Sequence, residues 1–502
     1  MDSSGASVAG QAPTASTDLG SHRQLFIGGE WVASSVDATF EVISPATGNA
    51  VASVALGSRA DIDRAVASAR AAFDQDAWSS YGLERRLELL RRFKDLVAQD
   101  HERLAQLLTA EMGSPITQSR TIQATNPIKL MEYLLELAES YAFRSIRRHP
   151  TGTALVTREP VGVVGAIIPW NMPAHQAISK IFPALLVGCT VVLKPVPQTA
   201  LDAFRLAELF AEAGFPPGVL SVVPAERDVS EYLVTHPGVD KVSFTGSTAA
   251  GRRIAELCGH DLRRVTLELG GKSAAVVLAD ADLDRTVDSL RMASFRNSGQ
   301  ICTLKTRILV PTSLHDGVVD RLVDLVGSMK VGDPADEDTQ IGPMVTQAHR
   351  ATVEALIAVG RREGASVVAG GGRPAGLDRG WYVSPTVFAH VDPRSTVARE
   401  EIFGPVVTVS TYENEEEAVR LANDSPYGLS GAVYTEDLER GARVASRIRS
   451  GVVELNGHPV GVAAPFGGFK DSGLGRENGP EGLSSYTELR SVGLPDGWAG
   501  EA

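Results

Sequence analysis

The sequence has 502 residues, and at roughly 150 residues per domain this length predicts about three folding units, with 43% hydrophobic residues to supply their cores. Its 48 Lys and Arg residues against 61 Asp and Glu residues give a net charge of −13, which disfavours nucleic acid as a partner. The three cysteines form neither a disulfide framework nor a Cys-x-x-Cys pair, so we expect a reducing, cytoplasmic compartment and no metal site.

The first segment, residues 1–20, contains no Lys or Arg and no apolar run. It lacks the features of a signal or transit peptide, and we expect a disordered tail. The longest apolar runs, 161–168 and 181–193, are shorter than the roughly 18 residues that a membrane-spanning helix needs. We therefore expect no membrane contact.

Apolar residues recur at helical spacing in the next part of the chain, with charged residues on the opposite faces, which predicts surface helices over 60–73, 83–100 and 103–112. Short β-branched runs then predict strands over 161–168, 190–193, 219–223 and 241–244. The segments between them, such as 200–213 and 250–257, are helical in pattern. Strands alternating with helices in this way predict a parallel sheet.

A second series follows the Gly270-Gly271 pair, with expected strands at 274–278, 307–310, 366–368 and 406–411 and expected helices at 283–296, 316–326 and 347–363. The alternation predicts two α/β domains that meet near residue 270. Segments 141–159 and 483–492 have extended character. They suggest an oligomerisation arm, although an exposed pair of strands would have the same pattern.

Two residues are candidates for covalent and acid–base chemistry. Cys302 follows Asn-Ser-Gly-Gln-Ile in a polar loop, where a thiol can be reached by solvent and lie near backbone N–H groups; a buried core thiol is the alternative, and it suits Cys189 and Cys258. Glu268 lies between two leucines and before two glycines. Apolar surroundings would raise its pKa, as a general base near neutrality requires; the alternative is an edge-strand acid that faces water.

Weaker signals come from three strand ends. Gly246 and Ser247 lead into an expected helix, where free N–H groups can bind a pyrophosphate, but the six-residue glycine fingerprint is absent and an ordinary capped helix fits as well. Lys194 can reach ribose hydroxyls or simply be solvated. Asn171 can donate a hydrogen bond to an oxyanion, while Trp170 beside it is expected to pack.

Seven stretches in this order make the sequence resemble the aldehyde dehydrogenase superfamily from about Leu25 to Leu489. They are PWN ending at Asn171, VVLKP with Lys194, FTGST from Phe244, LELGGK with Glu268, GQIC with Cys302, EEIFGPV from Glu400, and PFGGFKDSGLGRE ending at Glu477. The resemblance implies an α/β fold with two Rossmann-like parallel-sheet domains and a β-strand oligomerisation arm, assembled as a homodimer or homotetramer. It divides the chain into a cofactor-binding domain (21–144 and 161–269), a catalytic domain (270–479) and the arm (145–160 and 480–502).

The resemblance also implies a mechanism. The Cys302 thiolate attacks the aldehyde carbon, and Asn171 with the Cys302 N–H holds the oxyanion. After hydride transfer to a nicotinamide cofactor, water activated by Glu268 hydrolyses the thioester to a carboxylic acid. Lys180 and Glu477 match positions that support proton movement.

The cofactor-binding residues that the resemblance implies are Ile167, Pro169, Trp170, Lys194, Gly246, Ser247, Glu401 and Phe403. Lys194 is expected on the adenine ribose, Ser247 on the pyrophosphate, and Glu401 with Phe403 on the nicotinamide ribose. Many NAD-using members carry a glutamate three residues after the lysine, where this chain has Pro197. We expect NAD to be preferred and NADP to be accepted, because no carboxylate would repel a 2′-phosphate.

The substrate pocket is expected to include Met172, Ser179, Phe295, Val460 and Phe466. Met172, Ser179 and Val460 stand where many relatives have aromatic residues. We therefore expect a wider, less aromatic tunnel that suits an aliphatic or terpenoid-like aldehyde. Arg296 lies six residues before the nucleophile and could meet a substrate carboxylate. We expect it instead to face solvent at the end of a helix.

Other functions fit the sequence less well. A relative that transfers the acyl group to coenzyme A would generally not need Glu268, and a non-catalytic ligand-binding protein on the same scaffold would be expected to lose Cys302 or Glu268. A cysteine hydrolase would need a histidine poised against Cys302, and none of the ten histidines lies in such a motif. The acidic loop at 333–338 lacks the ligand spacing of a calcium loop and suits solvated surface.

Overall fold

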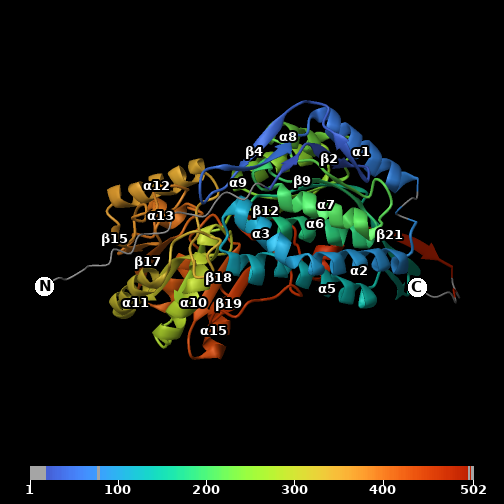
Figure 1. Cartoon of the computed structure of the whole chain (residues 1–502). Helices are drawn as coiled ribbons and strands as arrows, with labels where there is room; N and C mark the ends of the chain where they lie inside the picture. The colour runs from blue at the N-terminus through green and yellow to red at the C-terminus, as the bar shows by residue number, and fades with distance from the viewer. Residues whose placement is uncertain (1–18, 76–77, 79, 496–497, 499–502) are drawn as a thin grey trace.

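The computed structural model describes residues 19–75, 78, 80–495 and 498 (Figure 1). The tail expected at 1–20 falls outside these residues except for its last two, of which Leu19 donates a backbone hydrogen bond to Val51 O at 2.7 Å. The expected α/β fold with two parallel-sheet domains is confirmed, because helices cover two large and mostly parallel sheets. Within the described part of the chain, no helix has both the length and the apolar character needed to cross a membrane.

The first sheet has eight strands in the order β20-β12-β11-β8-β9-β10-β2-β3. Its five central strands are parallel, and antiparallel pairs close both edges. The strands are β2 (Gln24–Ile27), β3 (Glu30–Ala33), β8 (Val163–Ile167), β9 (Thr190–Lys194), β10 (Leu220–Val222), β11 (Lys241–Thr245), β12 (Arg264–Glu268) and β20 (Gly473–Leu474).

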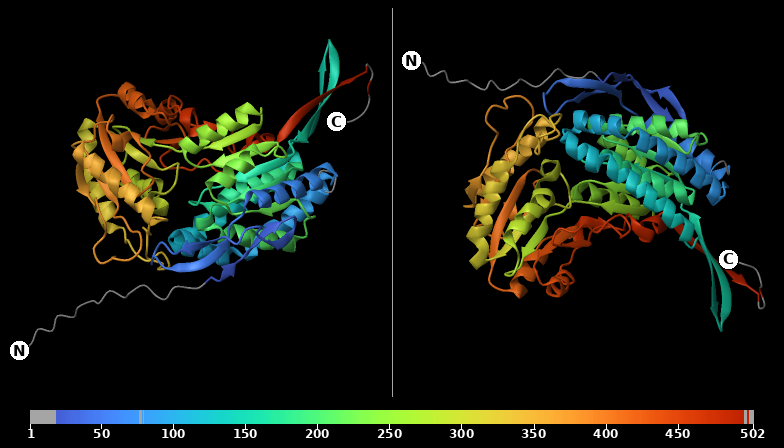
Figure 2. Two further views of the ribbon diagram at one scale, coloured as in Figure 1. Left: turned by 90° about the horizontal axis from the view of Figure 1, so that it is seen from above. Right: turned by 60° about the horizontal axis from the view of Figure 1, so that its bottom comes forward.

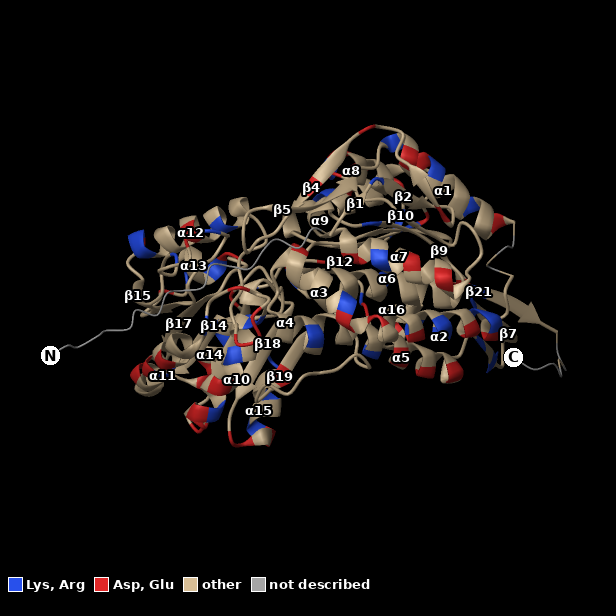
Figure 3. Ribbon diagram, in the orientation of Figure 1, with Lys and Arg blue, Asp and Glu red and all other residues tan. Residues whose placement is uncertain are grey.

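Each face of the first sheet is covered by its own set of helices. One core forms with α1 (Arg59–Asp74), α8 (Arg227–Thr235) and α9 (Thr248–His260). The other forms with α2 (Leu83–Gln99), α3 (His101–Met112), α5 (Thr125–Ser140), α6 (Pro173–Val187) and α7 (Leu201–Ala213). The helices predicted at 60–73, 83–100 and 103–112 are confirmed as α1 to α3, and Figure 3 shows charged residues along α1 and α2.

The second sheet has seven strands in the order β15-β16-β17-β14-β13-β18-β19, and only its β15 edge is antiparallel. The strands are β13 (Ser273–Val277), β14 (Lys305–Pro311), β15 (Ser366–Ala369), β16 (Thr386–Ala389), β17 (Val406–Tyr412), β18 (Ser430–Tyr434) and β19 (Val452–Leu455). Its covering helices are α10 (Leu283–Phe295) and α11 (His315–Ser328) on one core, α14 (Glu415–Asn423) and α15 (Leu438–Ala445) on another, and α12 (Gln347–Arg362) with α13 (Thr396–Arg399) beside β16.

A third, small sheet projects from the body of the molecule (Figure 2). It has the order β21-β7-β6, with β6 at Arg144–His149, β7 at Gly152–Pro160 and β21 at Thr487–Leu494. Two details differ from the expected division of the chain. Strand β20, inside the expected catalytic segment 270–479, pairs with β12 of the first sheet, and residues 479–484 form the helix α16 (Gly479–Ser484) against α6 instead of arm strand.

The N-terminal part of the chain adds a further small sheet and a short helical segment. A three-stranded sheet contains β1 (Ser21–His22), β5 (Ala50–Ala55) and β4 (Thr39–Ile43), and α4 (Ile116–Gln118) with the π-helical turn η1 (Ser119–Gln123) leads into α5. The two large sheets meet at the ends of their strands. The carboxyl ends of β8, β9, β11 and β12 and the amino ends of β13, β14 and β17 supply the segments that contact one another there, as the contacts below show.

Candidate active site

Cys302 lies in a tight loop between α10 and β14 that begins with the short helix η3 (Arg296–Gly299). Three consecutive residues adopt left-handed backbone angles, with φ of 51° at Asn297, 57° at Ser298 and 80° at Gly299. A Cβ at Gly299 would lie 2.0 Å from Gly404 O, so only glycine fits there. Cys302 follows this turn, and as a whole residue it is partly exposed, unlike the buried Cys189 and Cys258.

The electrostatic surroundings of Cys302 favour the protonated thiol. Burial raises its pKa to about 12, and the charges of Glu401 and Glu268 add to this effect, while Arg296 opposes it. The backbone N–H that the loop supplies lowers the pKa of this thiol, as the sequence suggested, but burial raises it by more. Gly271 packs so closely that a Cβ would lie 2.4 Å from Cys302 O, which explains the glycine after the Glu268 strand.

Glu268 is the last residue of β12 and is only 3% exposed. Neither carboxylate oxygen accepts a hydrogen bond from the described residues. Burial raises the pKa of Glu268 well above its ordinary value, the charge of Glu477 raises it further, and Lys180 and Arg476 oppose the shift. The alternative of an edge-strand acid facing water is wrong, because β20 and the residues around Gly467 cover β12 at this point.

Lys180 and Glu477 form a buried ion pair beside Glu268. The Lys180 Nζ lies 2.6 Å from Glu477 Oε1 and donates to Thr245 Oγ1 at 2.7 Å. Thr245 in turn donates to Gln176 Oε1 at 3.0 Å. The sequence analysis paired Lys180 with Glu477 but missed Gln176 and Thr245; the four-residue spacing of Gln176 and Lys180 on one helix was the available signal.

Asn171 is fixed against the loop that carries Cys302. Its Nδ2 donates to Gln300 O at 2.9 Å, and its backbone oxygen accepts from Asn297 Nδ2 at 3.0 Å and from Gln123 Nε2 at 3.3 Å. The amide nitrogen carries two hydrogens, and the second has no acceptor among the described residues. Asn171 is 5% exposed, so this free hydrogen lies in a nearly dry environment.

A cavity of about 620 Å³ lies at the carboxyl ends of β8 and β9 and is lined by Ile167, Lys194, Pro197, Ser247 and further residues of α8 and α9. Lys194 is 4% exposed, and burial lowers the pKa of its amine to about 8. Ser247 caps α9 by accepting from Ala250 N at 3.3 Å. The cavity thus combines a helix N-terminus, which favours anions, with a lysine.

Glu401 and Phe403 lie before β17 of the second sheet, outside this cavity. Glu401 accepts from Gly271 N at 2.8 Å, and burial raises its pKa to about 7. Phe403 has a left-handed φ of 58°, and its ring contacts Trp170 edge-on at 5.4 Å, so the expected packing of Trp170 is confirmed. Pro169 precedes Trp170 and is partly exposed, whereas Gly246 N donates to Glu268 O at 3.0 Å and holds β11 to β12.

The five expected pocket residues do not share one environment. Met172 clusters with Ile301 and Leu304 next to the Cys302 loop. Ser179 is a buried residue of α6, Val460 is 43% exposed, and the backbone of Phe466 pairs with Glu477 at 2.7 Å. Phe295 has no exposed surface and belongs to the core between α10, α11 and the second sheet, so its placement in a pocket is wrong: the last turn of α10 points it into the domain.

Arg296 does not face solvent, so that expectation is also wrong. It is partly buried, its Nη2 lies 3.5 Å from Thr303 Oγ1, and its buried Nε has no acceptor among the described residues. Glu454, which pairs with Lys305 Nζ at 2.7 Å, balances part of its charge. Sequence reasoning also missed His175, whose Nδ1 is buried without a partner and whose pKa burial lowers to about 4.

Comparison with known proteins adds a finding that decides the family. The model of the aldehyde dehydrogenase family matches residues 31–492. The chain belongs to the aldehyde dehydrogenase family. The resemblance of the seven stretches is thereby confirmed, and so is the enzyme class, since its relatives are named aldehyde dehydrogenases.

Three relatives illustrate the likeness. The chain is 49% identical to geranial dehydrogenase of Castellaniella defragrans over 94% of this chain and 99% of the relative. The crystal structure of an aldehyde dehydrogenase from Mycobacterium tuberculosis with NAD+ has a TM-score of 0.94 and 44% identity, and it covers 97% of this chain and 100% of its own. A mutant of aldehyde dehydrogenase C from Pseudomonas syringae with NAD+ and octanal has a TM-score of 0.91 and 41% identity, with 94% and 96% covered.

Proposed function

We propose that this member of the aldehyde dehydrogenase family oxidises an aldehyde to the carboxylic acid with Cys302 as nucleophile and Glu268 as general base. The observation that carries the proposal is that Glu401 packs against Gly270 and the Cys302 backbone oxygen against Gly271, directly after the strand that ends at Glu268, and that the charges of Glu401 and Glu268 both act on the Cys302 thiol. These glycines let the backbone approach so closely that three functional groups from three elements share one site. The nucleotide-sized cavity begins at the neighbouring strand ends.

The residues of that cavity fit a nicotinamide dinucleotide. Related structures are complexes with NAD+. Here Lys194 can donate to ribose hydroxyls, and the N-terminus of α9 behind Ser247 can bind the pyrophosphate. Glu401 and Phe403 lie on the far side, where the nicotinamide ribose would be held. When bound, this cofactor accepts the hydride of the aldehyde carbon.

The chain itself supplies the covalent and proton-transfer steps. The Cys302 sulfur forms a bond to the aldehyde carbon, the thiol proton leaves to a neighbouring carboxylate, and the new oxyanion receives the free N–H of Asn171. Loss of the hydride leaves a thioester on Cys302. Glu268 then takes a proton from water, whose oxygen bonds to the acyl carbon as the C–S bond breaks and the acid leaves.

Lys180 and Glu477 would carry the proton away from Glu268. Their ion pair is buried, and the charges of both residues act on the Glu268 carboxyl. Thr245, which accepts from Lys180 at 2.7 Å, extends the hydrogen-bonded path along the end of β11. The proposed role is to relay protons and to hold α6 against the strand ends.

The proposed substrate is an aliphatic or terpenoid-like aldehyde. The apolar cluster of Met172, Ile301 and Leu304 adjoins the Cys302 loop, and relatives are named for geranial or bind octanal. A free Arg296 would favour an aldehyde that carries a carboxylate. Thr303 and Glu454 already engage its side chain, so the aliphatic choice stands. We further propose a cytoplasmic homodimer or homotetramer with the division into cofactor-binding domain, catalytic domain and arm given above.

Rapid mixing of enzyme, NAD+ and octanal tests the mechanism. The Glu268→Gln variant has an amide of similar size that cannot act as a general base. We therefore expect a burst of about one NADH per active site, followed by turnover at least about a hundredfold slower than wild type. The Cys302→Ala control should show neither phase. The kcat/KM for octanal should also be higher than that for an eight-carbon aldehyde with a terminal carboxylate.

Each outcome separates the alternatives. Unchanged steady-state turnover of Glu268→Gln would remove Glu268 from the mechanism. Acceleration by coenzyme A instead of hydrolysis would assign the acyl-transfer reaction, and the absence of NADH in the wild type with every aldehyde would favour a non-catalytic scaffold. A higher kcat/KM for the carboxylated aldehyde would indicate that Arg296 binds the substrate carboxylate.

A further inference from the structure

A small group of polar side chains lies at the carboxyl edge of the second sheet, far from Cys302. His315 and Asp316 begin α11 after β14, and His390 directly follows β16. Strands β14, β17 and β16 are parallel neighbours, so β14 and β16 end at the same edge. Strand β14 has 7 residues, so the group lies about 20 Å from the loop that carries Cys302.

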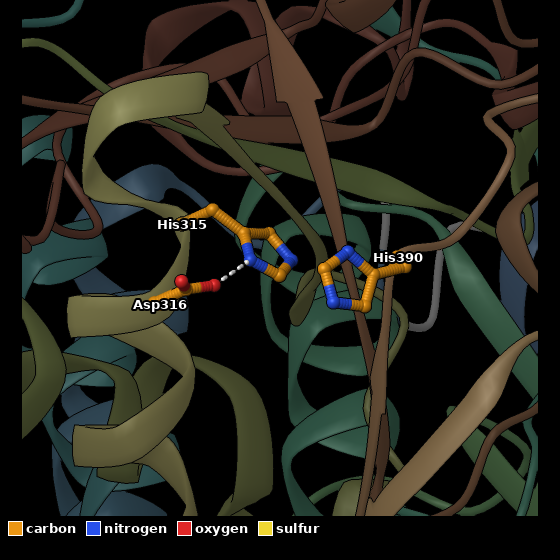
Figure 4. A group of neighbouring side chains, drawn as sticks. All are labelled: His315, Asp316 and His390. Atoms are coloured by element: carbon orange, nitrogen blue, oxygen red, sulfur yellow. Dashed lines mark hydrogen bonds and ion pairs between the residues drawn. The ribbon is translucent and has the colours of Figure 1, made fainter.

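The three side chains converge, as Figure 4 shows. His315 Nδ1 lies 2.8 Å from Asp316 Oδ1. The rings of His315 and His390 are stacked with centroids 4.2 Å apart and an interplanar angle of 28°. One ligand atom from each residue lies within 4.8 Å of the other two, and no second group of His, Cys, Asp and Glu in the described ranges is as close.

His315 has an unused ligand atom. Its side chain is only 5% exposed, and its Nε2 is buried without a hydrogen-bond partner. The hydrogen bond to Asp316 assigns the ring proton to Nδ1, so Nε2 carries a free lone pair. Figure 4 shows this edge of the ring facing His390. A buried acceptor without a partner is costly, and a bound cation would satisfy it.

We propose that His315 and His390 bind a divalent transition-metal ion of the Zn²⁺ type, with Asp316 orienting His315. Imidazole nitrogen suits Zn²⁺, Ni²⁺ and Cu²⁺, whereas Mg²⁺ and Ca²⁺ prefer oxygen ligands. A carboxylate that accepts the other ring N–H is the usual support of a histidine ligand. His390 is exposed, so its ring can turn to bring a nitrogen to about 2.0–2.1 Å from the ion, and water completes the coordination.

The ion would join the first turn of α11 to the end of β16. The unfolded chain does not hold the two histidines together, so binding favours the folded state and raises the melting temperature. This role is independent of the reaction proposed for Cys302. It concerns the cohesion of the second domain at the edge opposite the active site.

Calorimetric titration of the full chain with Zn²⁺ tests the proposal. The chain carries Cys302→Ala, so that the thiol cannot bind the ion. We expect about one bound Zn²⁺ per chain, an affinity at least about tenfold lower in His390→Ala and His315→Gln, and a loss of about 10–100-fold in Asp316→Asn. His390 is exposed, but it has a left-handed φ of 52° and its ring stacks on His315, so the metal-free melting temperatures of His390→Ala and the parent are compared to separate lost ligation from misfolding.

His260→Ala is the matched control. His260 Nδ1 lies 2.7 Å from Asp261 Oδ1, so it forms the same kind of neighbouring pair without belonging to a group of three. Its replacement should leave Zn²⁺ affinity unchanged. The proposal is overturned if the parent chain binds no Zn²⁺, if His390→Ala binds it as tightly as the parent, or if His260→Ala loses as much affinity as His390→Ala.

Discussion

Three ionisable groups at the proposed reacting centre are stabilised in their neutral forms. Burial raises the pKa of Glu268, that of Glu401 to about 7, and that of the Cys302 thiol to about 12. Burial disfavours the charged form of each group, so ionisation costs free energy. Their protonation states therefore control which step of the proposed reaction can proceed at a given pH.

The pH dependence of kcat follows from Glu268. A general base works only when ionised, and the pKa of Glu268 lies well above its ordinary value of 4.5. Deacylation should therefore slow as the pH falls through this raised pKa, which gives kcat a rising limb with its midpoint above 4.5. Profiles of kcat against pH for wild type and Glu268→Gln measure this midpoint. The rising limb should be absent in the variant. A midpoint at the ordinary carboxyl value would contradict the account.

Pro197 should determine tolerance of the 2′-phosphate of NADP. It lines the nucleotide cavity together with Lys194 and Arg227, and it places no negative charge there. We expect Pro197→Glu to lower kcat/KM for NADP by at least about tenfold relative to NAD, because the carboxylate repels the phosphate. Pro197→Gln is the uncharged control. An equal change of the NADP/NAD ratio in both variants would show that shape, not charge, is responsible.

Sequence and structure agree best where neighbours along the chain determine the environment. The leucines beside Glu268 favoured burial as one of two alternatives, and burial is what the structure shows; Cys302 in its polar loop is partly exposed, whereas Cys189 and Cys258 are buried. Arg296 and Phe295 were misplaced, because contacts with Thr303 and with the second core come from folding and not from sequence neighbours. Thr245 and Glu477, which contact Lys180, come from a strand and a loop far along the chain, and no local pattern shows them.

At the scale of elements, the projecting sheet has a clear structural consequence. Strand β21 pairs with β7 along eight residues, and its other edge has no partner in the described chain. Leu489 and Val492 on this strand are 58% and 45% exposed. An open strand edge with exposed apolar side chains favours pairing with another copy of the chain.

Light scattering tests this role of β21. The chain has a mass of 53.2 kDa, and we expect two or four times this value in solution. Replacing Leu489 and Val492 together by Lys should lower the mass, since charges would be buried at the contact. Leu262→Lys is the control, because Leu262 is 83% exposed outside the arm. A monomeric wild type would refute the oligomerisation role.

Amphipathic elements were predicted closely, whereas uniformly buried ones were not. Helices α1, α2 and α12 lie within two residues of their predicted limits, because each alternates apolar and charged faces. Helix α6 was missed: nearly every residue is buried, so no polar face marks it, and it contains Pro183. The three left-handed residues before Cys302 were also unpredictable, since packing against Gly404 imposes them.

At the scale of the whole molecule, seven short stretches separated by up to about a hundred residues supply the parts of the proposed site. Parallel strands explain this convergence, because all strands of a sheet end at one edge. The carboxyl edge of the first sheet carries Lys194 and Glu268, and the amino edge of the second receives Cys302 and Glu401. The order of these stretches predicted the fold class; the distances between them required the structure.

The central claim is that the acyl group of the substrate is carried by the sulfur of Cys302. Mass spectrometry of Glu268→Gln, quenched in acid after mixing with NAD+ and octanal, measures this directly. The account predicts one octanoyl group on the peptide that contains Cys302, and none when NAD+ is omitted. An unmodified Cys302 peptide during NADH release, or an acyl group on Cys189 or Cys258, would contradict it.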